Sequence, residues 1–230
     1  MVAEVMIARK WFGAGPRCRW LLMALLAASS VGCQKTYYTV LEKVGVEKRD
    51  LLSSRVERAK ESQQAAQEEF RDALEEFQAV TAHDGGELED RYERLRDAYE
   101  QSEERAREVS ERIEKIDSVA EALFDEWERE LDQYEDASLR RSSNERLQDT
   151  RREVKELLAV MHKAEQSLDP VLRKLNDRVL YLKHNLNAAA LAGLDATLPE
   201  LERDVTRLVS EMQRSISQAD RFIEQLNKSG

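Results

Sequence analysis

A short polar cluster in the last quarter of the chain has the residue types that could bind a ligand. Lys183, His184, Asn185 and Asn187 lie within one five-residue stretch. An ammonium group, an imidazole and two amides could hydrogen bond a polar ligand or contact a partner protein. The same residues could instead form a polar helix flank whose amides bond neighbouring helices, and we favour this second interpretation. They are therefore candidate partner or ligand contacts, without a catalytic role.

The sequence contains no motif for the common catalytic or metal-binding chemistries. Di-iron helical bundles use Glu-x-x-His, but Ala159 stands three residues before His162 and Tyr181 three residues before His184. There is also no Cys-x-x-Cys zinc pattern, no Gly-x-Ser-x-Gly elbow and no G-x-x-x-x-G-K-[ST] phosphate loop. We therefore predict a protein that is not an enzyme, with no catalytic residues, no metal site and no cofactor.

The composition favours long, solvent-exposed helices. Charged residues make up 36% of the 230 positions, with only eight glycines and three prolines, a balance typical of helical rods. Lys and Arg number 36 against 46 Asp and Glu, which gives a net charge of −10. An acidic chain is disfavoured as a binder of nucleic acid, so we expect no nucleic-acid partner.

The first 33 residues have the order of an export signal. Basic residues from Arg9 to Arg19 precede the apolar run 20–28, and small residues follow up to Cys33. Only about fourteen uncharged residues lie between Arg19 and Gln34, too few for a helix to cross a bilayer core of roughly 30 Å. Residues 1–32 are therefore predicted to be a cleaved signal peptide, followed by a tether over 33–49.

The end of this segment, Val31-Gly32-Cys33, resembles the lipobox of bacterial lipoproteins. The resemblance implies cleavage before Cys33 and attachment of diacylglycerol to its sulfur. Ser30 stands where the lipobox usually has leucine, which leaves open ordinary cleavage nearby and a soluble periplasmic protein. Gln34 follows the cysteine, and in lipoproteins the absence of Asp there implies the periplasmic face of the outer membrane.

The elements that must carry these groups are helices with apolar seams. Steps of four and three residues from Leu88 to Tyr134 meet almost only apolar side chains, a heptad pattern typical of a coiled coil. Similar seams predict an all-α fold, an elongated antiparallel bundle or coiled coil of four main helices over residues 50–228. The expected helices are 50–82, 88–137, 143–192 and 197–228, with a turn at 83–86.

Local signals predict where these helices begin and end. Ser142 with Glu145 forms a capping box that starts the third helix. Gly193 ends that helix, and Thr197 with Glu200 caps the fourth.

The unequal helix lengths predict the shape of the bundle. The third helix is expected to pass Pro170 with a kink. Antiparallel packing then predicts a four-helix section around 52–115 and 165–226. The remaining residues, about 116–164, are predicted to project as a two-helix coiled-coil arm. Four equal helices are the alternative if residues 36–82 form one helix.

Two stretches, 37–50 and 179–188, resemble a bacterial family of helical proteins classified only as a domain of unknown function, numbered 2959. The similarity covers most of residues 34–226. Members often look like exported lipoproteins, and some carry the label of a DNA-repair ATPase. The label does not fit this chain, because Gly85-Gly86 is followed by Glu87 rather than by a phosphate-binding lysine. The family offers no catalytic residues to transfer.

Together these features predict a non-enzymatic periplasmic lipoprotein, a helical scaffold or interaction protein of the cell envelope. The membrane, reached through the lipid on Cys33, and an unknown envelope protein are the expected partners. Whether the coiled-coil arm pairs within one chain or between chains stays open. A ligand-binding bundle using the Lys183–Asn187 region is the alternative, and a cytosolic coiled-coil factor associated with DNA is a weaker one.

Overall fold

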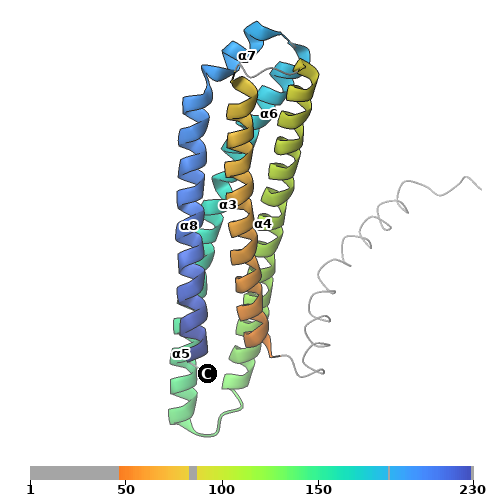
Figure 1. The fold of residues 1–230 in the computed structure, drawn as a ribbon. Helices are drawn as coiled ribbons and strands as arrows, with labels where there is room; N and C mark the ends of the chain where they lie inside the picture. Colours follow the sequence, from red (N-terminus) through yellow and green to blue (C-terminus); the bar gives the residue numbers. More distant parts are fainter. Residues whose placement is uncertain (1–46, 83–86, 186, 229–230) are drawn as a thin grey trace, which may run out of the picture. The chain divides into compact units, whose positions relative to one another are not determined.

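The computed structural model describes residues 47–82, 87–185 and 187–228. The predictions for residues 1–32, for Cys33 and for the turn at 83–86 lie outside them. The chain divides into two units, Met1–Glu47 and Lys48–Gly230, and the second holds every described helix (Figure 1). The helices are α3 (Lys48–Thr81), α4 (Leu88–Leu131), α5 (Ala137–Gln166), α6 (Leu168–His184), α7 (Ala188–Asp195) and α8 (Leu198–Lys228).

The second unit is an elongated helical bundle, which confirms the predicted all-α class. The helix α3 packs against α4 and α8, while α5 and α6 follow each other along the opposite side and pack against the same two helices (Figure 1). With 44 residues at 1.5 Å each, α4 runs for about 66 Å.

The third long helix expected over 143–192 is divided into α5, α6 and α7. Its predicted start at Ser142 is wrong, because α5 begins at Ala137. The carboxylate of Asp136 accepts hydrogen bonds from the amides of Ser138 and Leu139, at 2.7 and 3.1 Å. Asp136 therefore satisfies the free amides of the first turn, as a helix N-cap does.

The chain passes Pro170 with a one-residue interruption at Ser167. Ser167 keeps right-handed helical angles, and its hydroxyl donates to the carbonyl of Ala164 at 2.6 Å. Pro170 is the third residue of α6, where a missing amide hydrogen costs little because first-turn amides have no partner within the helix. The expected kink thus takes the form of a break between α5 and α6.

The predicted helix end at Gly193 is also wrong, because α6 ends at His184 and Gly193 lies inside α7. Thr197 does stand directly before α8, but its hydroxyl donates to the carbonyl of Leu194 at 2.7 Å. It also accepts a hydrogen bond from Arg178 Nε at 3.1 Å. The hydroxyl of Thr197 therefore joins α8 to α6 and α7, in place of the predicted capping box with Glu200.

The predicted arm over 116–164 is too long. Lys48, the first residue of α3, forms an ion pair with Glu126 of α4 at 3.0 Å, so the four-helix section reaches close to the end of α4. Near the same level, Arg49 donates to the carbonyl of Leu226 in α8. For α8 the difference arises because α7 lies across the end of the bundle instead of lengthening the third helix, so α8 starts beside Arg178 of α6 (Figure 1).

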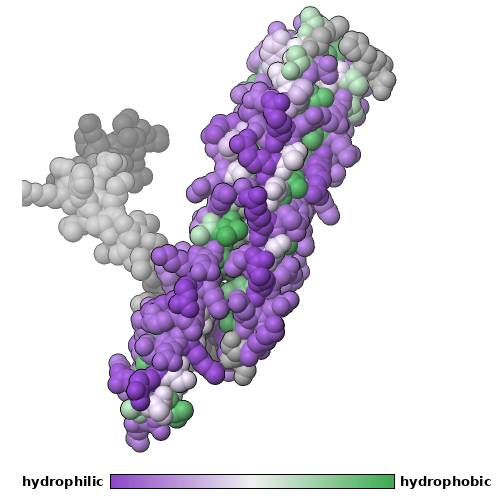
Figure 2. Space-filling view, turned by 90° about the vertical axis from the view of Figure 1, so that its left-hand side faces the viewer, coloured by the Kyte–Doolittle hydropathy of each residue, from purple (hydrophilic) through white to green (hydrophobic). Residues whose placement is uncertain are grey.

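The core follows the apolar seams, and the visible face in Figure 2 is mostly hydrophilic with small hydrophobic patches. The heptad pattern places Glu130 on the buried face of the second expected helix, and Leu158 and Leu172 on that of the third. The helix faces are rotated slightly from this pattern, because Leu131, Leu157 and Val171 are the buried residues instead. The largest fully buried side chains are Phe70, Phe77, Phe222, Leu52, Ile113, Ile116, Leu147, Leu157, Met161, Leu182, Leu201 and Leu208.

Two polar side chains interrupt this core in one layer. Gln63 on α3 and Ser215 on α8 are fully buried, and neither side chain has a hydrogen-bond partner. The flanking contacts align them: Lys60 pairs with Asp220 at 3.0 Å on one side. On the other side, Gln67 donates to the carbonyl of Val209 at 2.9 Å.

Candidate functional site

The predicted polar cluster lies at the junction of α6 and α7. Lys183 and His184 are exposed on the last turn of α6. Asn185 donates its amide Nδ2 to the carbonyl of Tyr181 at 2.9 Å, and the Oδ1 of Asn187 accepts from the amide of Ala190 at 3.0 Å. Both asparagines thus bond the backbone around the α6–α7 junction, whereas the favoured interpretation predicts bonds to neighbouring helices. A ligand role for this segment stays a prediction.

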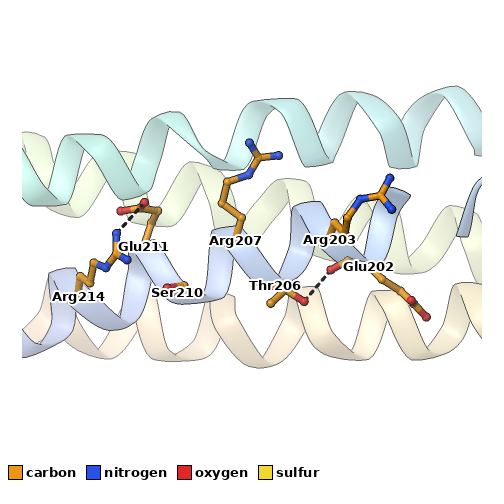
Figure 3. A pocket seen from close by; sticks show the side chains of 7 residues that line it. All are labelled: Glu202, Arg203, Thr206, Arg207, Ser210, Glu211 and Arg214. Atoms are coloured by element: carbon orange, nitrogen blue, oxygen red, sulfur yellow. Dashed lines mark hydrogen bonds and ion pairs between the residues drawn. The ribbon is translucent and has the colours of Figure 1, made fainter. Parts of the chain in front are cut away.

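A shallow groove of about 460 Å³ lies on the outer face of α8. Figure 3 shows its lining, which comes from this one helix: Glu202, Arg203, Thr206, Arg207, Ser210, Glu211 and Arg214.

Opposite charges along the groove neutralise one another. Arg214 donates to Glu211 at 3.1 Å, Lys163 of α5 donates to the same carboxylate at 3.1 Å, and Arg207 pairs with Asp204. An anionic ligand would have to displace these pairs, so the groove is not built as an anion site. Sequence reasoning missed it because charged residues three and four apart on a helix are common on any wet face.

The densest polar contacts join α6 to the first turns of α8. Lys174 reaches both Glu200, at 2.5 Å, and Asp204. The hydrogen bonds that Lys174 donates to these two carboxylates raise the pKa of Lys174, and the bond that Glu200 accepts from Lys174 lowers the pKa of Glu200. Burial acts to raise the pKa of Asp204, but hydrogen bonds from Lys174 and Arg207 outweigh it and lower that pKa.

Arg178 extends this contact toward α3. Its guanidinium lies 5.4 Å from the ring centroid of Phe77 and donates to the hydroxyl and carbonyl oxygens of Thr197, at 3.1 and 3.3 Å. Burial lowers the pKa of Arg178. These contacts hold the ends of α3, α6 and α8 together. We call Lys174, Arg178, Thr197, Glu200 and Asp204 the structural clamp.

Because the clamp contains two carboxylates with lowered pKa values, the free energy of unfolding is expected to fall at acid pH. Carboxylates with a lowered pKa contribute stability that is present above their unfolded pKa near 4 and lost as pH falls through the folded pKa. Lys174→Met is therefore expected to destabilise the bundle at pH 7, and the difference from the parent should shrink as pH falls through the lowered folded pKa values of Glu200 and Asp204.

Urea denaturation of both proteins across this pH range measures the effect. The matched control is Lys183→Met, which removes an exposed lysine in the last turn of α6 and should leave the pH dependence unchanged. A Lys174→Met protein with the same pH dependence as the parent would show that the ion pairs do not contribute.

The described residues offer neither a metal centre nor a membrane span. Within 47–82, 87–185 and 187–228, no three His, Cys, Asp or Glu side chains gather closely enough to hold a metal ion. Over the same ranges, no helix combines the length and the apolar character needed to cross a bilayer.

Comparison with known proteins identifies a family. No curated protein and no solved structure matches the chain. A family model described as "Protein of unknown function (DUF2959)" matches residues 37–226, which include all but the last two residues of the described bundle. This confirms the resemblance drawn from the stretches 37–50 and 179–188, and the chain belongs to the DUF2959 family of proteins of unknown function.

Proposed function

We propose that this protein is a non-enzymatic lipoprotein of the cell envelope. In this proposal the chain is anchored by lipid on Cys33 at the periplasmic face of the outer membrane. Its helical bundle then serves as a scaffold that meets an envelope protein. The basic, apolar and small-residue order of residues 1–33 supports the anchor.

The scaffold role is supported chiefly by the close packing of the bundle interior. Apolar side chains fill the core from Leu52 near the start of α3 to Leu226 near the end of α8. Most buried polar groups bond carbonyl oxygens of the bundle, as Gln67 does with Val209 and Arg91 does with Val80. Such an interior maintains a rigid rod, and the surface is left for contacts with partners.

The anchor is tested by metabolic labelling with palmitate. The parent chain is expected to take up label and to fractionate with the outer membrane. Cys33→Ala is expected to lose the label, because the acylated sulfur is gone. Cys18→Ala is the matched control, since Cys18 lies within the predicted signal peptide, and it should label like the parent. Labelling that persists in Cys33→Ala would refute the anchor.

The scaffold role is tested separately by crosslinking in intact cells. We expect the anchored parent to capture an envelope protein reproducibly. This capture should be lost when surface residues of the bundle are changed without loss of helicity. A substrate turned over by the purified protein, with turnover abolished by heat denaturation, would contradict the non-enzymatic role.

A further inference from the structure

Exposed large apolar side chains gather at the two ends of the bundle. Among the residues that the structure describes, four such side chains are exposed. Tyr134 and Leu139, exposed by 41% and 57%, flank the turn between α4 and α5. Leu180 and Tyr181, both exposed by 45%, lie near the end of α6, at the other end of the bundle (Figure 1).

The chain enters the bundle at the first of these ends. Lys48 begins α3 and pairs with Glu126, only five residues before the last residue of α4, Leu131. The α4–α5 turn projects beyond this level (Figure 1). The 34 residues of α3 span about 50 Å, which separates this end from the end that carries Leu180 and Tyr181.

Side-chain contacts join α4 and α5 next to the turn. Trp127 donates its indole hydrogen to the hydroxyl of Ser143 at 2.8 Å, across the two helices. Arg140 pairs with Asp132 at 2.7 Å. Tyr134 and Leu139 therefore lie on a hairpin whose two helices are joined by these contacts.

Its surface chemistry suits a lipid headgroup layer of mixed charge. A tyrosine carries an apolar ring with a polar hydroxyl, and such side chains are enriched at membrane interfaces. Around it, Glu135 and Arg141 are exposed beside the Asp132–Arg140 pair. This mixture of signs matches zwitterionic headgroups, which carry a phosphate and an amine, better than an anionic surface.

We propose that the α4–α5 turn, through Tyr134 and Leu139, rests in the headgroup layer of the membrane that holds the anchor. This rests on the proposed function. Residues 34–47 separate Cys33 from α3, and at 3.3–3.6 Å per residue they span at most about 50 Å. A tether of this length creates an effective concentration of about a millimolar, so a contact too weak to bind free protein becomes populated.

Spin labels at the two ends test the proposal in the full lipoprotein, purified and reconstituted into phosphatidylcholine and phosphatidylethanolamine vesicles. Glu135→Cys places a nitroxide at the turn, and Lys183→Cys places one at the far end. Cys33 is acylated and Cys18 removed in the proposed mature protein, so only the introduced cysteine reacts. The label at 135 should be more accessible to oxygen, which enters the bilayer, and less accessible to a water-soluble nickel complex than the label at 183.

Two double variants are expected to differ in their effect on the label at 135, since only the first changes the proposed contact. Tyr134→Ser with Leu139→Ser should lower the equilibrium constant for membrane contact about tenfold. The label should then resemble the one at 183. Leu180→Ser with Tyr181→Ser makes the matching change at the far end and should leave the label at 135 unaffected. All four side chains are exposed, and circular dichroism checks that both variants stay helical.

The possible failures are distinguishable. Protein that does not float with the vesicles refutes the anchor and the contact together. Protein that floats, with equal accessibility at 135 and 183, refutes the contact alone. Membrane contact of the turn that is seen only after phosphatidylglycerol is added to the vesicles refutes the assignment to zwitterionic headgroups. If the protein self-associates and the label at 135 is shielded from the nickel complex without becoming more accessible to oxygen, the turn contacts a second copy of the chain, and the membrane contact is refuted.

Discussion

Replacing Phe77 by alanine is expected to lower the free energy of unfolding by about 3–5 kcal/mol. Phe77 is fully buried on α3, so its removal leaves a cavity that the helices cannot close completely. Its ring also faces the guanidinium of Arg178 at 5.4 Å, and a nearly buried cation loses that favourable aromatic face. Urea denaturation followed by circular dichroism measures the loss.

A second arginine–phenylalanine pair provides the control. The guanidinium of Arg151 lies 5.1 Å from the ring centroid of Phe124, but Phe124 is only half-buried. Phe124→Ala should therefore cost about 1 kcal/mol, because it removes a similar cation–π contact without opening a closed cavity. Equal losses in the two variants would contradict the placement of Phe77 in the core.

Replacing Gln63 by leucine is expected to stabilise the protein by about 1–3 kcal/mol. Both polar atoms of this buried amide have no hydrogen-bond partner, so the folded state bears the cost of removing them from water. Leucine has a similar volume and no such cost. The change is expected to raise the urea midpoint while leaving the slope of the transition unchanged.

Gln67, one turn further along α3, should respond in the opposite direction. Its Nε2 donates to the carbonyl of Val209 at 2.9 Å, so Gln67→Leu loses a made hydrogen bond and should destabilise by about 0.5–1.5 kcal/mol. If Gln63→Leu also destabilises, Gln63 has a partner in solution, such as a buried water shared with Ser215.

The helical class was predictable because seams repeating every three and four residues report burial directly. The helix ends were less predictable, since competing caps differ by only about 1 kcal/mol. Ser142 with Glu145 matches the capping-box pattern, yet Asp136 starts α5 with hydrogen bonds to two amides. The rotation that buries Leu157 instead of Leu158 follows from a helical period of 3.6, which drifts from a strict heptad over several turns.

The polar contacts depended on alignments that sequence spacing cannot supply. Lys174 meets Asp204 across 30 positions of the chain because α7 lies across the bundle end and returns α8 alongside α6. The asparagines were recognisable as hydrogen-bonding residues. The helix α6 ends where Asn185 adopts the non-helical backbone angles φ −136° and ψ 55°. The pattern of leucines in the sequence does not predict these angles, so it does not predict that the asparagines bond the backbone at this helix end.

Mass spectrometry of the amino-terminal peptide, from protein purified out of the cell envelope, tests the central functional claim most directly. The expected peptide begins at Cys33, lacks residues 1–32 and carries the mass of a diacylglycerol on its sulfur. A mature chain that retains residues 1–32, or that begins elsewhere without lipid, would contradict the account.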